Sequence, residues 1–193
     1  MVFFVASRRV SANTLKRHYG NAYIIDVTSQ GVEPWIHFSP FYPHGNIPVP
    51  FTSGVVSASV EGVWQGLKVF ENMDVDPSRF RVTTMKGIKR SARKYGKVLG
   101  HRAGIKGEQL LSYLEARWQI YLPSYRWILD HCLQEELAAL HRMAQEKSVV
   151  LLDYETNCDI EDSSRPLSHA GLIKCYLEGN WPIRLDKNVL PAL

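Results

Sequence analysis

Apolar residues form short runs with strand character in three separate parts of the chain. Residues 2–6, 22–27 and 149–152 are apolar and of the length of buried strands. Between the first two runs, Ser11 is a suitable N-cap for a helix that Gly20 ends. The N-terminal 30 residues are therefore expected to form strand, helix and strand.

Helical periodicity dominates the second half of the chain. Leucine and aromatic residues recur at helical spacing over residues 107–145, with a break or kink expected at Pro123. Ser168 is placed to cap a last helix over residues 170–177. A length of 193 residues suits one domain. We predict a helix-rich single domain of the α+β class with a small sheet, made of an N-terminal segment, a core and a C-terminal strand and helix over residues 1–30, 31–145 and 146–193.

Residues 57–70 have the pattern of an amphipathic helix that carries an acid and an amine on one side. Glu61 and Lys68 lie seven positions apart, which places them about 20° apart on a helix surface and two turns removed. Trp64 and Gln65 fill the turn between them on the same face. Two interpretations stand at this point, namely an ordinary amphipathic surface and a site in which an acid and an amine act together.

The segment before this helix combines prolines with a high density of aromatic residues. Five prolines over residues 30–53 exclude a regular helix, and the aromatic side chains are too dense for a disordered linker. We expect an ordered loop that packs on the body of the protein. Ser59 is expected to be the N-cap of the helix that follows, and Asn72 to end it.

Charged residues gather in two further stretches. Residues 86–106 contain eight Lys or Arg residues and four glycines. Phosphate binding is one interpretation, and a solvated helix face with ends broken by glycine is the other. Carboxylates gather after the strand predicted over residues 149–152, beginning with Asp153 and Glu155.

The composition excludes several classes of protein. No apolar run approaches the roughly 20 residues that cross a bilayer, so we expect no membrane association. Dinucleotide-binding, P-loop and α/β-hydrolase motifs are absent. The odd number of cysteines, three, favours a reducing cytoplasm. Because the chain has no CxxC motif and its seven histidines are scattered, we expect neither a metal site nor a cofactor. The net charge of +4 suits a ligand that carries phosphate.

Two motifs together resemble a known family. Residues 37–43 read His-Phe-Ser-Pro-Phe-Tyr-Pro, and residues 59–68 read Ser-Val-Glu-Gly-Val-Trp-Gln-Gly-Leu-Lys. Their order and spacing resemble the NADAR-type N-glycosidases, which have a Phe-Ser-Asn-Phe-Tyr-Pro loop and then a helix of the form Thr/Ser-Val-Glu-His-Tyr-Tyr-Gln-Ala-Gln-Lys. Residues 91–96 are similar to that family's Ala-Lys/Arg-x-x-Gly segment, and the resemblance covers roughly residues 35–140. Pro40 and Gly62 depart from the pattern, since they replace an Asn and a His.

The resemblance implies a NADAR-like fold and metal-free cleavage of an N-glycosidic bond in a ribosyl nucleotide or an ADP-ribosyl conjugate, as a small molecule or in nucleic acid. Breaking the bond between ribose C1 and nitrogen develops positive charge on the sugar, and the leaving group needs a proton. Glu61 is the candidate acid/base or stabiliser of that charge. Lys68 is the candidate nucleophile or Schiff-base former. Asp153 or Glu155 would supply a second carboxylate.

The same resemblance implies a set of contacts to the substrate. Aromatic side chains would stack on the base, and Arg93, Lys94 or Lys97 would hold phosphate. The expected contacts are Phe38, Ser39, Tyr42, Trp64, Gln65, Arg93, Lys94 and Glu155. A module that binds nucleotides or single-stranded nucleic acid without catalysis is the competing interpretation, and a decayed site in a partner-binding protein is a third.

Overall fold

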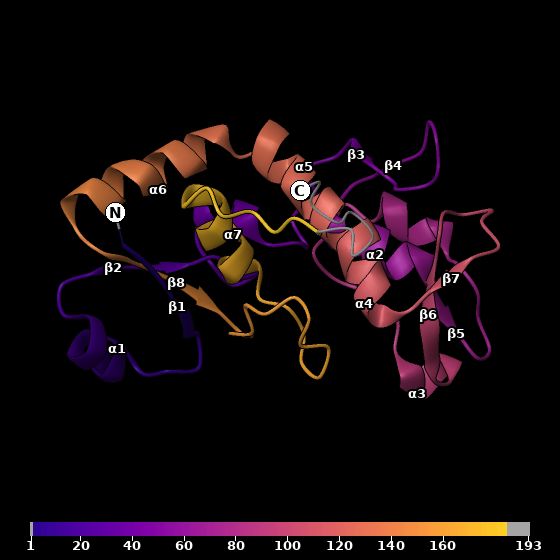
Figure 1. The fold of residues 1–193 in the computed structure, drawn as a ribbon, viewed down its shortest axis with the longest axis horizontal. Coiled ribbons are helices and arrows are strands. Elements are labelled where there is room, and N and C mark those ends of the chain that lie inside the picture. The colour runs from indigo at the N-terminus through magenta and orange to yellow at the C-terminus, as the bar shows by residue number, and fades with distance from the viewer. Residues whose placement is uncertain (1, 185–193) are drawn as a thin grey trace, which may run out of the picture.

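A three-stranded parallel sheet joins the two ends of the chain. The computed structural model describes residues 2–184. β1 (Phe3–Ser7), β2 (Tyr23–Asp26) and β8 (Val149–Asp153) are hydrogen-bonded in the order β1-β8-β2, with β8 buried along its whole length (Figure 1). Both pairings are parallel. The carboxyl ends of all three strands therefore lie at one edge of the sheet.

The N-terminal strand, helix and strand are confirmed. α1 (Ala12–Tyr19) links β1 to β2, and the Ser11 hydroxyl accepts a hydrogen bond from the Thr14 N–H at 3.3 Å. Leu15 of this helix packs against Val150 and Leu152 of β8 in a small second core. Because β8 lies between β1 and β2, the N-terminal and C-terminal segments share one sheet.

The ordered loop before α2 is present as predicted. It contains the 3-10 helix η1 (Trp35–Phe38) and β3 (Ile47–Pro48), and β3 pairs antiparallel with β4 (Val56–Ser57). The Glu61 N–H donates a hydrogen bond of 2.7 Å to the Pro40 carbonyl. This bond fixes the loop against the first turn of the helix.

α2 (Val60–Leu67) begins at the predicted residue. The Ser59 hydroxyl accepts a hydrogen bond from the Gly62 N–H at 3.0 Å, which satisfies a free donor of the first turn. Gly66 lets this helix approach Phe80 closely, since a Cβ atom at position 66 would lie 2.1 Å from the ring. The helix is therefore buried on nearly all sides.

The predicted extension of this helix to Asn72 is wrong. The chain becomes extended directly after Leu67 and continues as β5 (Lys68–Phe70). β5 pairs antiparallel with β6 (Val98–Arg102), and β6 pairs with β7 (Leu110–Leu111). Pairing with β6 supplies the backbone hydrogen bonds that a longer helix would have made within itself.

The helices predicted over residues 107–145 are confirmed from Tyr113 onward, whereas Leu110 and Leu111, expected in the helix, form β7 because they pair with β6. α4 (Tyr113–Ala116) runs through the π-helical turn η3 (Arg117–Tyr121) into α5 (Leu122–His131), and α6 (Gln134–Glu146) follows. Pro123 sits in the first turn of α5, where its missing N–H is tolerated. The irregularity that we expected at this proline is the π-helical turn directly before α5.

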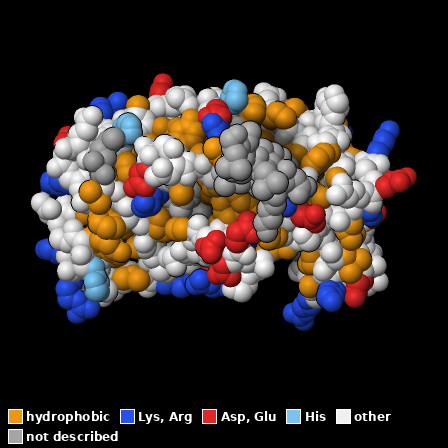
Figure 2. Space-filling view, in the orientation of Figure 1, with side chains coloured by type: hydrophobic (Ala, Val, Ile, Leu, Met, Phe, Trp, Pro, Cys, Tyr) orange, Lys and Arg blue, Asp and Glu red, His pale blue; other side chains and the backbone are white. Residues whose placement is uncertain are grey.

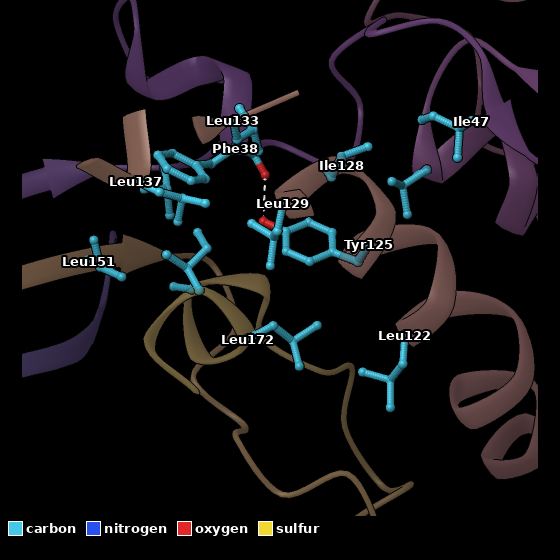
Figure 3. Close-up of a cluster of buried hydrophobic side chains, with 14 of the residues drawn as sticks. Phe38, Ile47, Leu122, Tyr125, Ile128, Leu129, Leu133, Leu137, Leu151 and Leu172 are labelled. Carbon is cyan, nitrogen blue, oxygen red and sulfur yellow. Dashed lines mark hydrogen bonds between the residues drawn. The ribbon is translucent and has the colours of Figure 1, made fainter. Parts of the chain in front are cut away.

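The main core lies where α5 and α6 meet α7 (His169–Leu177) and the aromatic loop. The Tyr125 hydroxyl donates a hydrogen bond of 2.7 Å to the Phe38 carbonyl, drawn as a dashed line in Figure 3. Around this pair the figure shows the buried side chains of Ile47, Leu122, Ile128, Leu129, Leu133, Leu137, Leu151 and Leu172.

These elements form a single domain of the mixed α+β class, as predicted. In residues 2–184, each helix is too short or too polar to cross a bilayer. The last nine residues of the predicted C-terminal segment, 185–193, lie outside the described part of the chain.

Candidate functional site

A cavity of about 540 Å³ lies between the carboxyl edge of the parallel sheet and α2. Pockets of this size hold ligands as large as a nucleotide. It is lined by Arg9, Thr28, Ser29, Ser39, Pro40, Phe41, Glu61, Trp64, Gln65, Lys68, Lys89, Arg90, Tyr113, Arg117, Tyr121, Asp153, Tyr154, Glu155, Pro166, Leu167 and His169. On the face shown in Figure 2, acidic side chains gather over the segment that follows β8.

Seven of the eleven residues predicted for the site line this cavity. They come from the aromatic loop, from α2, from β5, and from the end of β8 with the segment after it, which are far apart in the sequence. These seven are Ser39, Glu61, Trp64, Gln65, Lys68, Asp153 and Glu155. Glu61 and Lys68 share the cavity although Lys68 is not on the helix, because β5 starts directly after the last turn of α2.

Glu61 is buried and held by its neighbour Gln65. The Gln65 Nε2 donates a hydrogen bond of 2.8 Å to Glu61 Oε1, and its Oε1 accepts one of 3.0 Å from the Arg90 N–H. Both ends of the Gln65 amide are therefore used within the protein, which fixes its orientation. Gln65 is a positioning residue for Glu61 in this arrangement.

Burial brings the proton affinities of Glu61 and Lys68 closer together. Loss of solvent raises the pKa of Glu61, although Gln65, Lys89 and Lys68 act in the opposite direction. Loss of solvent lowers the pKa of Lys68, against the attraction of Glu61. Because the two pKa values approach each other, moving a proton between the groups costs less free energy than it would in water.

One wall of the cavity is aromatic. The Trp64 ring lies 3.7 Å from the buried His101 ring between centroids, and it forms T-shaped pairs with Tyr113 and Tyr121 at 5.8 and 5.7 Å. Burial lowers the pKa of His101 to about 3, so this imidazole is neutral. The Lys68 Nζ lies 5.8 Å from the Trp64 ring centroid. A flat ligand group thus finds an aromatic surface beside the amine.

Two buried arginines shape the cavity through backbone carbonyls. Arg90 donates hydrogen bonds of 3.1, 2.7 and 2.7 Å to the carbonyls of Gln65, Lys68 and Asp74. Arg117 donates to carbonyls of the segment after β8, those of Ile160, Asp162 and Arg165. Both guanidinium groups therefore hold chain segments in place rather than pointing freely at a ligand.

Asp153 forms a buried ion pair with His169. The two side chains approach to 2.9 Å, while the other ring nitrogen of His169 lies 2.9 Å from the Val27 carbonyl. Since both ring nitrogens face acceptors, the ring is held as an imidazolium. Burial alone would raise the pKa of Asp153, yet His169, Ser168 and the Ala170 N–H lower it to about 2. Asp153 is therefore an ionised carboxylate and not a proton donor at neutral pH.

Tyr121 is a cavity residue that the sequence did not reveal. It ends the π-helical turn η3, and such turns are frequent at functional sites. Its hydroxyl has no hydrogen-bond partner within residues 2–184. Burial and the nearby carboxylates Glu61 and Asp153 raise its pKa well above 10. The group is a neutral donor that faces the ligand space.

Two of the predicted aromatic contacts lie outside the cavity. Phe38 is fully buried in the main core, where its ring stacks on Trp35. The ring of Tyr42 packs between His37 and His44, at 4.4 and 4.9 Å between centroids. The expectation that Phe38 and Tyr42 stack on a base is therefore corrected. Phe41, between them in the loop, lines the cavity instead.

The predicted phosphate contacts Arg93 and Lys94 also lie outside the cavity. Both are exposed on the one-turn helix α3 (Ala92–Tyr95), at the end of the β5-β6 pair opposite α2 (Figure 1). Lys97, also exposed, follows this helix and lies outside the cavity as well. From the same basic stretch, Lys89 and Arg90 line the cavity. The basic stretch therefore does contribute cations to the cavity, but the residues that do so are Lys89 and Arg90 and not Arg93 and Lys94.

The residues that follow β1 and β2 were missed, although a signal existed. Arg9, Thr28 and Ser29 come directly after these strands, and ligands of parallel sheets bind at the carboxyl ends of strands. No comparable sequence signal marks Arg117 or Tyr121, because helical periodicity treats them as ordinary helix positions. Among residues 2–184, no group of three or more His, Cys, Asp or Glu side chains is placed to hold a metal ion.

Comparison with known proteins places the chain in a family. Neither the curated proteins nor the solved structures gave a match. A family of unknown function, DUF6939, matches residues 7–173. The matched range includes every residue that lines the cavity. The chain is therefore a member of the DUF6939 family.

Proposed function

We propose that this protein is a metal-free hydrolase that cleaves the N-glycosidic bond of a ribosyl nucleotide or an ADP-ribosyl conjugate. The observation that carries the proposal is that Glu61 and Lys68 line one cavity of about 540 Å³ together with the loop residues Ser39 and Phe41. The resemblance of the loop and helix motifs to the NADAR-type N-glycosidases supports the same reaction, and a NADAR-like fold is part of the proposal.

Glu61 and Lys68 divide the chemistry between them. The neutral Lys68 amine attacks ribose C1, and the C1–N bond breaks with its electron pair leaving on the base nitrogen, which takes a proton from Glu61. The C1–O4 bond of the ribosylated lysine then opens, O4 takes the proton lost from the lysine nitrogen, and an imine forms. Water hydrolyses the imine and returns the free amine.

A second route uses Glu61 without attack by Lys68 and without a covalent intermediate. The base leaves with the electron pair of the C1–N bond, and the Glu61 carboxylate stabilises the oxocarbenium ion that remains at C1. Water attacks that ion directly and gives up a proton, which the base nitrogen takes. Asp153 contributes a fixed negative charge in either route, because its low pKa keeps it ionised. Trp64 and Phe41 supply surfaces for the base.

Release of free base from N-ribosyl compounds tests the proposal. NAD⁺, AMP, GMP and ADP-ribosylated guanosine serve as substrates, and chromatography detects the base. We expect Glu61→Gln to slow release at least about 100-fold while the fold survives. Glu135→Gln is the matched control, since Glu135 is exposed on α6 and lies outside the cavity.

Borohydride separates the two routes. Reduction during turnover would convert an imine at Lys68 into a stable amine, visible as added mass on the peptide that contains Lys68.

Release of base at the wild-type rate in the Glu61→Gln variant would remove this acid from the mechanism. Nucleotide binding without base release from any substrate would favour the competing function, a nucleotide-binding module.

We place the activity in the cytoplasm as part of the proposal. Cys132, Cys158 and Cys175 are free thiols, as is usual in a reducing compartment.

A further inference from the structure

The sheet-side wall of the cavity carries a second cluster of polar groups. Arg9, Ser29 and Tyr154 follow β1, β2 and β8, and all three line the cavity. They meet because the carboxyl ends of the three parallel strands share one edge. The proposed chemistry at Glu61 and Lys68 uses none of them.

Arg9 is oriented but not neutralised. Its Nη1 donates a hydrogen bond of 2.9 Å to the Tyr154 carbonyl, and its guanidinium carbon lies 5.5 Å from the Tyr154 ring centroid. The preceding Arg8 pairs with Asp26 at 2.6 Å. Arg9 forms no ion pair within the part of the chain that the structure describes. The side-chain hydroxyls of Ser29 and Tyr154 have no hydrogen-bond partner there either.

The charges around the cavity favour an anionic ligand. Five Lys or Arg side chains and three Asp or Glu side chains line it. Arg90 and Arg117 are engaged with carbonyls, and Asp153 is paired with His169. Arg9 is therefore the cation of the sheet-side wall that is available to a ligand, and Glu155 is the carboxylate of that wall that opposes an anion.

We propose that this edge of the sheet binds a phosphate group of the ligand, with Arg9 as the charged donor and the hydroxyls of Ser29 and Tyr154 as further donors. A guanidinium group matches two phosphate oxygens at once. The inference rests on the proposed function for the rest of the ligand. It specifies a nucleotide whose phosphate contacts the sheet while its ribose C1 faces Glu61.

Matched pairs of ligands test this site without requiring turnover. Calorimetry compares AMP with adenosine and GMP with guanosine. Arg9→Gln should weaken binding of each monophosphate about tenfold or more and leave the nucleosides unchanged, since a charged hydrogen bond is lost only with phosphate. Arg9→Lys should recover part of the affinity. Glu155→Gln should tighten binding of the monophosphates, because it removes a repelling charge.

Arg17→Gln is the control for net charge, since Arg17 is exposed on α1 and lies outside the cavity. It should leave every affinity unchanged. Equal losses for nucleotide and nucleoside in Arg9→Gln, no loss at all, or a wild-type protein that binds no monophosphate more tightly than its nucleoside would overturn the phosphate site.

The outcomes for this site and for the proposed hydrolase are separable. If no base is released from any substrate but monophosphate binding depends on Arg9, the hydrolase fails and the phosphate site stands. If base is released and depends on Glu61, while Arg9→Gln changes neither monophosphate affinity nor KM, the hydrolase stands and the phosphate site fails.

Discussion

The buried pair of Asp153 and His169 makes a quantitative prediction about pH-dependent stability. The pKa of Asp153 falls from an ordinary 3.8 to about 2 in the folded protein. This difference corresponds to about 2.5 kcal/mol of unfolding free energy, because each tenfold change in proton affinity is worth about 1.4 kcal/mol. His169 supplies the largest contributions that lower this pKa. We expect His169→Gln to reduce the unfolding free energy by about 3 kcal/mol, since it leaves a buried carboxylate without its partner.

The sign of the pH dependence follows from both partners. A lowered pKa at Asp153 stabilises the fold above about pH 4, and this stability is lost as the pH falls toward 2. The pKa of His169 is raised by Asp153 against the effect of burial, so its contribution is complete below its ordinary 6.5 and is lost as the pH rises through the raised value. The difference between wild type and variant should therefore be largest at about pH 5 and shrink on either side.

Urea unfolding at about pH 3, 5 and 9 measures this difference. Gln at position 169 keeps a side chain that can reach the Val27 carbonyl, so the variant mainly removes the charge. A loss of stability that is the same at all three pH values would refute the electrostatic reasoning, because a packing defect has no such pH dependence.

Two further predictions separate chemistry from packing. Tyr121→Phe should slow base release at least about tenfold with little change in stability, because it removes a free hydroxyl from the cavity; unchanged release would exclude that hydroxyl from the reaction. Tyr125→Phe, its control, should instead lower the unfolding free energy by about 1–3 kcal/mol through loss of the bond to Phe38, with normal release from the folded protein. Gly66→Ala should destabilise by about 1–3 kcal/mol in urea unfolding, because the added Cβ would lie 2.1 Å from the Phe80 ring. The double variant with Phe80→Leu should recover part of this loss, and an unaffected single variant would show that α2 and Phe80 can move apart.

Local features of the chain were determined by the sequence alone. Ser11, Ser59 and Ser168 cap helices as predicted, because a side-chain oxygen satisfies the first free N–H groups wherever a helix follows. The proline-rich segment is an ordered loop, since its aromatic residues need burial and its prolines cannot enter a helix. The pattern at Glu61 and Gln65 also placed both side chains on one face of α2.

Tertiary structure alone decided how these pieces meet. α2 ends at Leu67 because β6, some 30 residues later, offers hydrogen bonds to Lys68 and its neighbours. β8 enters between β1 and β2, which brings Asp153 beside residues from the N-terminus. Within the basic stretch, exposure of Arg93 and burial of Arg90 depend on partners that are distant in sequence. The pattern of residues within a segment indicates which secondary structure that segment favours. The contacts that form the cavity are made between distant segments, and they produce no periodicity within any one of them.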